Sequence, residues 1–490
     1  EFRDGRTRQG SGEGRRDRER RRRRVDDPWE EKKLLHDTPR GYIPKRFILS
    51  LLLHLGLFVV YALRVCISVA AAAPSAHALP SNSSVPTEVT GVSMYTEYSW
   101  TNTEQGIILG SFFNGYITTQ IIGGILARRY GGKSVLFGGV LLASLFTFLT
   151  PPASKNFTML VICRTLMGAV EGVSFPAILT IIGHWAPAQE RSTMVGFVYA
   201  GAYTGNVVTF PLSAWIMDTY GWRTIFYFFA CLGFLWCLLF HLFTTSTPSQ
   251  HRSMHAAELN KILATTQVAE DVPATVPWKK ILVCMPAWAL FVVHTCFNWA
   301  FYTLLTQLPS YMALVLGFNM QQSGFLSSMP YLFMFIVSIL GGMLADWTIS
   351  RGLLSRTRVR KTWMVTSLMV PACCLVLCGY ASSWPVAIFF MTCALGFSGL
   401  SNAGYSANYL EISAGLSGIL ISLGNTLATV PGMVSPVLTG VIMDAHGCSI
   451  EHVSSCQQAY QTVFWIAFMV YTFGAVFYAT FATSERVLKF

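Results

Sequence analysis

The sequence predicts an all-α membrane protein whose twelve transmembrane helices form two halves of six. Three observations lead to this prediction: the chain is poor in charge, its apolar segments are long enough to cross a bilayer, and one polar stretch divides them into two equal sets. Of the 490 residues, 52% are hydrophobic and 12% are charged, whereas a soluble domain carries about a quarter charged residues. This composition excludes an ordinary water-soluble fold.

Much of the charge lies in residues 1–46, which contain 16 Lys and Arg and 10 Asp and Glu. The segment lacks the apolar core of a secretory signal peptide, so we expect a disordered, basic cytoplasmic tail rather than a leader. The chain starts without Met and runs through a low-complexity Arg stretch, which leaves open that part of the tail is artefactual. We favour a solvated tail over a nucleic-acid contact, and we expect no nucleic acid as a partner.

Apolar runs of roughly 20 residues predict the spans. Residues 47–243 form the first six-helix half, 244–284 a cytoplasmic central loop, 285–482 the second half and 483–490 a cytoplasmic tail. The predicted limits of the spans are 47–72, 105–127, 134–150, 157–182, 193–216, 224–243, 285–313, 323–345, 362–380, 384–408, 412–442 and 460–482.

The basic residues of the loops predict the orientation. With the N-terminus in the cytoplasm, the cytoplasmic loops contain 13 Lys and Arg, whereas the opposite loops contain only Lys155 and Arg223. Because cytoplasmic loops of membrane proteins are enriched in Lys and Arg, we expect both termini in the cytoplasm.

Two features fall on the opposite, luminal or external side. Asn82 begins an Asn-Ser-Ser triplet in the loop after the first span and is a candidate glycosylation site. Cys448 and Cys456 lie in the polar loop before the last span. An oxidising lumen would favour a disulfide between them, and two free thiols are the alternative.

Three charged residues lie well inside predicted spans: Arg64, Arg164 and Glu171. Ionisable groups at membrane depth are costly, and they mark pathways for substrates or ions. Arg64 and Arg164 start about 11–12 Å below the luminal boundary at a rise of ~1.5 Å per residue, a matched depth that suits an anionic substrate. Glu171 lies two turns from Arg164 on the same face, ~10 Å deeper, and is a candidate proton-coupling group. Structural ion pairing is the alternative, which we disfavour because buried pairs contribute little stability.

The second half places His294 in the middle of a span, together with Asn298 and Tyr302. His294 is a candidate proton relay or a hydrogen-bonded core residue, and the polar groups could line a cavity opposite the charged half. Later spans add Asn402, Asn408 and Asn425. The sequence shows no metal-ligand cluster, nucleophile motif or phosphate-binding loop, so we expect no enzymatic activity, no metal and no cofactor.

A short segment is repeated at corresponding places in the two halves. Residues 123–133 read GGILARRYGGK after the second span, and residues 341–347 read GGMLADW after the eighth. The pattern resembles the signature loop of the major facilitator superfamily, whose halves are parallel repeats around a midplane site. The first copy departs from the pattern with Arg128 where many members have Asp, whereas Asp346 keeps it in the second.

Four longer motifs, at 61–65, 110–116, 171–177 and 298–305, resemble the anion–cation symporter family of that superfamily. The similarity runs from about residue 47 to residue 483. It is greatest to the lysosomal carriers that transport sialic acid together with a proton. It implies that Arg64 contacts a substrate carboxylate. The resemblance also implies that Glu171 takes part in proton coupling. The aromatic, charged and polar side chains implied to surround the substrate carboxylate are Tyr61, Tyr116, Tyr302, Arg164 and Asn298.

The sequence also differs from particular branches of the family. Leu109 and Phe297 stand where vesicular glutamate carriers have His and Arg, which disfavours glutamate as a substrate. Met167 and Leu179 stand where the sialic acid carriers have Glu and His.

The residues and the resemblance together predict a secondary active transporter of small organic anions. We expect proton-coupled symport of acidic sugars such as sialic acid and glucuronate out of an acidic lumen, by alternating access, in a protein that acts as a monomer in the lipid bilayer. The alternatives are a sodium-coupled carrier of phosphate or organic anions, a vesicular loader of amino acids or nucleotides driven by membrane potential, and a non-transporting receptor.

The tail carries one sorting pattern. Glu30 precedes the pair Leu34-Leu35 by four residues, which fits an acidic dileucine signal read by clathrin adaptors. A chance Leu pair is the alternative. We expect the membrane of the lysosome or a related acidic vesicle as the location, with the plasma membrane as the second possibility.

Overall fold

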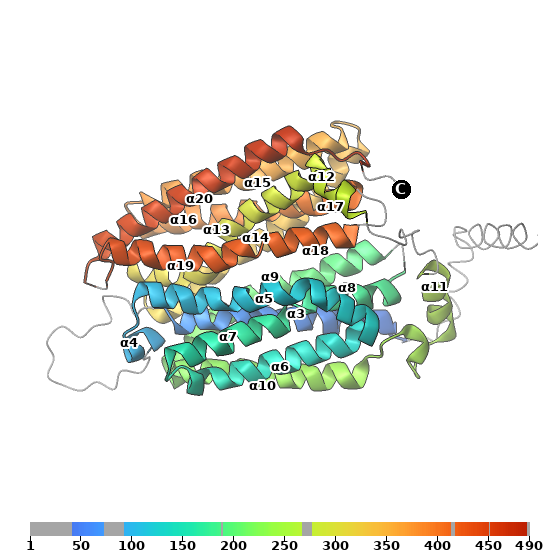
Figure 1. Ribbon diagram of the computed structural model, residues 1–490, viewed down its shortest axis with the longest axis horizontal. Helices are drawn as coiled ribbons and strands as arrows, with labels where there is room; N and C mark the ends of the chain where they lie inside the picture. Colours follow the sequence, from blue (N-terminus) through green and yellow to red (C-terminus); the bar gives the residue numbers. More distant parts are fainter. Residues whose placement is uncertain are drawn as a thin grey trace, which may run out of the picture.

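Long helices lie side by side and form an elongated bundle (Figure 1). The computed structural model describes residues 42–72, 93–187, 190–266, 277–412, 417–449 and 451–487, and all regular structure in these ranges is helical. Asn82, Glu30, Leu34 and Leu35 lie outside them, so the glycosylation and sorting assignments stay predictions.

The described residues contain twelve helical spans, which confirms the predicted fold class. The first half comprises α3 (Lys45–Ala70), α5 (Asn102–Tyr130), α6 (Gly132–Ala153), α7 (Phe157–Glu171) continued by α8 (Ser174–Trp185), α9 (Arg191–Tyr220) and α10 (Trp222–Phe243). The second half comprises α13 (Met285–Leu314), α14 (Met320–Ser350), α15 (Arg356–Gly379), α16 (Trp384–Ser398) continued by η3 (Gly399–Asn402) and α17 (Tyr405–Ile412), α18 (Ser417–Leu427) continued by α19 (Val430–Ala445), and α20 (Val453–Phe481). Short helices outside the spans are α4 (Met94–Tyr98), η2 (Pro248–Gln250), α11 (Ala256–Thr266) and α12 (Trp278–Val283).

Ten of these spans are long and apolar enough to cross a membrane by length and composition. The other two, α5 and α9, are of similar length, at 29 and 30 residues, but are not among these ten. Both pack against the opposite half, α5 on α19 and α9 on α14. These two spans therefore lie at the contact between the halves.

Several predicted limits were wrong. Helix α5 continues to Tyr130, and α6 starts at Gly132, so the signature segment is a helix end with a single break at Gly131, where φ is 85°. Span ten extends to Ile412 instead of 408, and the described part of span eleven starts at Ser417 instead of 412. The last span starts at Val453 rather than 460. At spans two, three, ten and twelve, hydrogen-bonded helix continues past the apolar run on which the limit was based.

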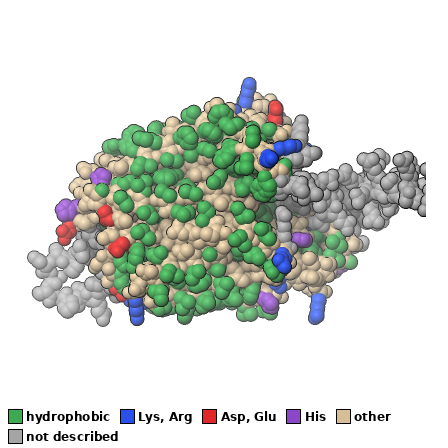
Figure 2. All heavy atoms as spheres, viewed as in Figure 1, with side chains coloured by type: hydrophobic (Ala, Val, Ile, Leu, Met, Phe, Trp, Pro, Cys, Tyr) green, Lys and Arg blue, Asp and Glu red, His purple; other side chains and the backbone are tan. Residues whose placement is uncertain are grey.

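The two ends of the bundle differ in charge. We name the end at which α3 and α13 begin the basic end, and the end that carries Cys448 and Cys456 the disulfide end; the two cysteines form a disulfide. Figure 2 shows hydrophobic side chains over the flank of the bundle, with most of the visible Lys and Arg at the basic end. This surface fits a bilayer around the flank and water at both ends.

The two halves are packed together at the disulfide end. The carboxylate of Asp444, at the end of α19, accepts hydrogen bonds from the backbone N–H groups of Asn102 and Thr103 at 3.2 and 2.9 Å, and from their side chains at 2.9 and 2.5 Å. On the other side of the bundle, Gln321 of α14 donates to Asp218 of α9 at 2.6 Å. The disulfide end is therefore closed by contacts between halves.

Charged groups at the basic end fasten α11 to the first half. Glu258 accepts hydrogen bonds from the backbone N–H groups of Lys45 and Arg46, which begin α3, at 3.0 and 3.1 Å. Glu190 binds Arg46 and Lys261 at 2.8 and 3.0 Å. Burial alone would raise the pKa of Glu190, but the hydrogen bond and charge of Lys261, together with Arg46, hold it below its usual value.

Helices α5 and α7 approach each other through glycine, which brings their functional side chains together. A Cβ added at Gly168 would overlap the carbonyl oxygen of Phe112 and lie 3.0 Å from the backbone nitrogen of Tyr116. Only a residue without a side chain allows this contact.

We expect Gly168→Ala to destabilise the protein by about 1–3 kcal/mol, because the added methyl group forces the two backbones apart. The melting temperature of the purified protein in detergent measures this change. Gly138→Ala in α6 is the matched control, since its Cβ would meet nothing within 4 Å. Equal melting temperatures for the two variants would contradict the expected packing.

Candidate functional site

An ion pair joins the first span to the fourth inside the bundle. Arg64 of α3 donates from Nη2 and Nε to Oε2 of Glu171, at 3.2 and 3.4 Å. Glu171 is the last residue of α7 and is 0% exposed, and Arg64 is 4% exposed. The second carboxylate oxygen, Oε1, has no hydrogen-bond partner among the described residues. The sequence had placed Glu171 on the same face as Arg164, but its ionic partner is Arg64.

Three aromatic rings surround the guanidinium group of Arg64. Its central carbon lies 4.8, 4.6 and 4.7 Å from the ring centroids of Tyr61, Phe112 and Tyr116. Faces of aromatic rings attract cations, most strongly where water is excluded. The rings therefore help to hold a positive charge inside the membrane.

Arg164 of α7 is the second buried cation, and it lacks an acidic partner in the described structure. Its Nη2 donates to the backbone carbonyl of Arg64 at 3.2 Å, and its Nη1 lies 3.1 Å from the sulfur of Met167. Its Nε is buried without a partner. Because arginine stays protonated in proteins, the cluster of Arg64, Arg164 and Glu171 carries one positive charge more than negative when Glu171 is ionised.

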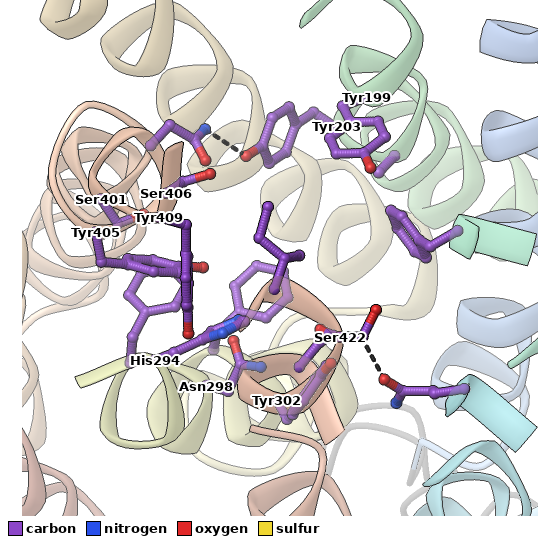
Figure 3. A pocket seen from close by; sticks show the side chains of 18 of the residues that line it. Tyr199, Tyr203, His294, Asn298, Tyr302, Ser401, Tyr405, Ser406, Tyr409 and Ser422 are labelled. Carbon is purple, nitrogen blue, oxygen red and sulfur yellow. Dashed lines mark hydrogen bonds between the residues drawn. The ribbon is translucent and has the colours of Figure 1, made fainter. Parts of the chain in front are cut away.

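A cavity of about 200 Å³ lies between the two halves, next to this cluster (Figure 3). Tyr61 connects the two, since it lines the cavity and stacks on Arg64. No Lys, Arg, Asp or Glu is among the described residues of its wall. The wall is formed by Tyr61, Gln120, Phe175, Pro176, Leu179, Tyr199, Ala202, Tyr203, Asn206, His294, Phe297, Asn298, Phe301, Tyr302, Met334, Ser401, Asn402, Tyr405, Ser406, Tyr409, Ile421, Ser422 and Asn425.

Three spans break near the centre of the bundle, and all three contribute to the cavity wall. The breaks lie between α7 and α8, around η3, and between α18 and α19. Interrupted helices are tolerated at membrane depth where they line a cavity or are buried in protein. The lining segments of all three lie on the basic-end side of their breaks, so the cavity extends from the centre toward the basic end.

Amide side chains connect the two halves across the cavity. Asn425 donates to Gln120 of α5 at 2.6 Å, and Gln120 donates to Thr429 at 2.7 Å. On the opposite wall, Asn402 donates to the hydroxyl group of Tyr203 at 2.8 Å. These neutral contacts link the halves without adding charge.

A much smaller space of about 10 Å³ lies on the disulfide-end side of the cluster and is lined by both Arg64 and Arg164. Thr306 and Leu305 of α13 close it from the second half. Both arginines therefore face this small space, and Arg64 also contacts Tyr61, which lines the large cavity.

The structure brings most of the predicted residues together. Arg64, Arg164, Glu171, Tyr61 and Tyr116 form the charged cluster, while Tyr302 and Asn298 line the cavity beside it. The amide of Asn298 donates to the carbonyl of Ala428 at 2.8 Å, at the break in span eleven.

His294 stands apart from the cluster. Its ring packs 4.5 Å from the ring of Tyr405 and lines the cavity, and its Nδ1 has no partner among the described residues. Asn408 does not reach the cavity wall, because it donates to Tyr478 at 2.9 Å instead. The sequence analysis missed Gln120, Tyr203 and Asn206; for the two amides, Gln120 and Asn206, a polar side chain within an apolar helix was the available signal.

Twelve spans in two halves, with a polar cavity between them and buried charge beside it, define a membrane transporter of the alternating-access class. The sequence matches the family described as Major Facilitator Superfamily over residues 53–436. Sialin from Homo sapiens is 38% identical over 453 residues, which cover 90% of this chain and 90% of sialin. Vesicular glutamate transporter 2.1 from Danio rerio is 33% identical, over 93% of this chain and 77% of that protein.

Solved structures show the same fold. An inward-facing, occupied bacterial homologue of the human lysosomal transporter Spinster superposes with a TM-score of 0.69 at 15% identity, covering 89% of this chain and 97% of that one. The chain belongs to the major facilitator superfamily and, within it, to the family of sialin and the vesicular glutamate transporters, which confirms the predicted resemblance. It is a transporter and not an enzyme.

The unequal partners of the two arginines lead to a prediction about stability. We expect Arg64→Met to destabilise the protein by about 3–5 kcal/mol, because it leaves the buried carboxylate of Glu171 without its partner. Arg164→Met removes the cation that has no ion pair in the described residues, and it should leave the melting temperature unchanged or higher. Comparable losses in both variants, measured in detergent at neutral pH, would show that Arg164 has a charged partner of its own.

Proposed function

We propose that this protein is a proton-coupled symporter of small organic anions, with acidic sugars such as sialic acid and glucuronate as substrates. The observation that carries the proposal is the charge imbalance of the buried cluster, in which Glu171 is the one carboxylate that the described residues place beside Arg64 and Arg164. This excess of positive charge would attract an anionic substrate, and a guanidinium group can bind a carboxylate through two parallel hydrogen bonds.

Proton coupling follows from competition for Arg64. While Glu171 is ionised, it occupies two donors of that guanidinium group. Protonation of Glu171 removes its charge and weakens the pair, so that a substrate carboxylate can take its place. Binding one proton and one monoanion leaves the net charge of the cluster unchanged, which avoids placing additional charge at membrane depth.

The large cavity supports a neutral, hydroxyl-rich substrate body. Its described wall offers amides, hydroxyl groups and aromatic rings but no charged side chain, so a second carboxylate on the substrate would find no cation there. Phe297, which stands where vesicular glutamate carriers have Arg, lies in this wall and adds no positive charge to it. This favours a sugar acid with one carboxylate over a dicarboxylate amino acid such as glutamate.

The closed disulfide end and the cavity toward the basic end support one step of an alternating-access cycle. In the other step, the halves would rock to close the basic end and open the disulfide end. We further propose that the disulfide end faces the acidic lumen of a lysosome or related vesicle and that both termini are cytoplasmic. The loop charges and the 38% identity to sialin support this placement, and the plasma membrane is the alternative.

Transport in proteoliposomes tests the proposal. We expect an acid-inside gradient to drive efflux of sialic acid from vesicles containing the wild type, and Glu171→Gln to lose at least tenfold of this stimulation because the glutamine cannot carry a proton. Exchange of labelled for unlabelled substrate without a gradient should persist, since it needs no net proton movement.

His294→Gln separates the two candidate proton groups, and we expect it to keep the stimulation. Gradient-driven efflux by Glu171→Gln at the wild-type rate would refute the proposed coupling. Replacement of sodium by choline at fixed pH, and an imposed membrane potential, distinguish the sodium-coupled and potential-driven alternatives.

A further inference from the structure

Asn206 occupies a distinctive place in the cavity wall. It belongs to α9 and is 0% exposed. Tyr199, Ala202 and Tyr203 precede it by seven, four and three residues, a spacing that places all four on one helix face. All four line the cavity, and Figure 3 shows Tyr199 and Tyr203 at one side of it.

Neither polar atom of the Asn206 side chain has a hydrogen-bond partner among the described residues. A buried donor or acceptor without a partner destabilises a protein, and native structures contain few of them. Asn206 has two such atoms in a single side chain. The fold therefore retains an amide side chain that lowers its stability and has no hydrogen-bond partner among the described residues in this conformation.

The other amides of the wall make hydrogen bonds that hold parts of the structure together. Asn425 and Gln120 connect the halves, Asn298 binds the broken part of span eleven, and Asn402 binds Tyr203 and Ser338. Asn206 makes no contact of this kind in the described residues. A purely structural role consequently explains the other amides and leaves Asn206 unexplained.

We propose that Asn206 is a substrate-binding residue that recognises a neighbouring donor and acceptor on the neutral part of the ligand. An asparagine amide offers two N–H donors and a carbonyl acceptor, which complements an acetamido group or two adjacent hydroxyl groups. The inference rests on the proposed function, because it assumes that the substrate binds with its carboxylate at Arg64 and Arg164 and with its neutral part in the cavity.

This role makes Asn206 a determinant of specificity. A site built to hydrogen-bond a polar group discriminates strongly against ligands that lack it, whereas an apolar wall discriminates weakly. Asn206 should therefore favour hydroxylated anions over apolar anions of the same charge and ring size.

The test uses the full-length protein in proteoliposomes and measures how well two anions inhibit sialic acid uptake. Glucuronate carries adjacent hydroxyl groups, and cyclohexanecarboxylate has a ring of equal size without them. We expect Asn206→Leu, which is similar in volume, to weaken inhibition by glucuronate at least about tenfold and to leave inhibition by cyclohexanecarboxylate unchanged or stronger. Residual sialic acid uptake provides the signal.

Thr209→Val is the matched control. Thr209 lies three residues further along α9, is 0% exposed and also has an unpartnered hydroxyl group, but it does not belong to the described cavity wall. We expect this variant to keep the wild-type ratio of the two inhibition constants. Both variants should melt at or above the wild-type temperature, because each replaces an unsatisfied polar group by an apolar one.

The outcomes are distinct. An unchanged ratio in Asn206→Leu, with wild-type uptake, would refute the role of Asn206 and leave the proposed function intact. Absence of uptake in the wild type would refute the proposed function and, with it, this inference. If Asn206→Leu does not fold, Asn206→Ala replaces it with the same expected loss of discrimination, and a wild-type ratio in that variant refutes the proposal.

Discussion

Two guanidinium groups and one carboxylate, held together inside a membrane bundle, set the constraint on which the rest of the structure depends. A charge removed from water is tolerated only where it is paired or otherwise compensated. Arg64 obtains its compensation from Glu171 and from three aromatic faces. Arg164 obtains less, from one carbonyl group, one sulfur atom and the ring of Phe112, whose centroid lies 5.4 Å from its central carbon. The glycines between α5 and α7 and the break after Glu171 bring these groups to one place.

The two halves also contribute differently to the site. Among the described residues, the first half supplies the charged side chains of the cluster, while both halves contribute neutral amides, hydroxyl groups and rings to the cavity wall. A ligand with a charged head and a polar, uncharged body would contact both halves at once. Such a ligand can therefore influence how the halves sit relative to each other, which an ion bound to one half alone could not do.

The sequence was sufficient to predict the number of spans, the two halves and the three intramembrane charges, because long apolar runs and rare charges are strong local signals. It could not show that Arg64 rather than Arg164 binds Glu171. Position along a helix gives depth, but the pairing depends on how neighbouring helices are rotated and packed. The break between α7 and α8 was not visible either, because residues 172 and 173 continue an apolar run. The sequence shows Asn206 as an amide inside a span, but its lack of partners is a property of the folded structure alone.

The contacts of Asp444 have a consequence for the energy of the transport cycle. Its carboxylate joins the halves only through hydrogen bonds with groups at the exposed start of α5. When the halves separate there, water can replace each bond, and the net cost per bond is about 0.5–1.5 kcal/mol. Hydrogen bonds of this kind fix the geometry of the closed end, yet breaking them in water costs little free energy. Two conformations of comparable free energy are what a carrier requires if it is to return to its starting state after every molecule it moves.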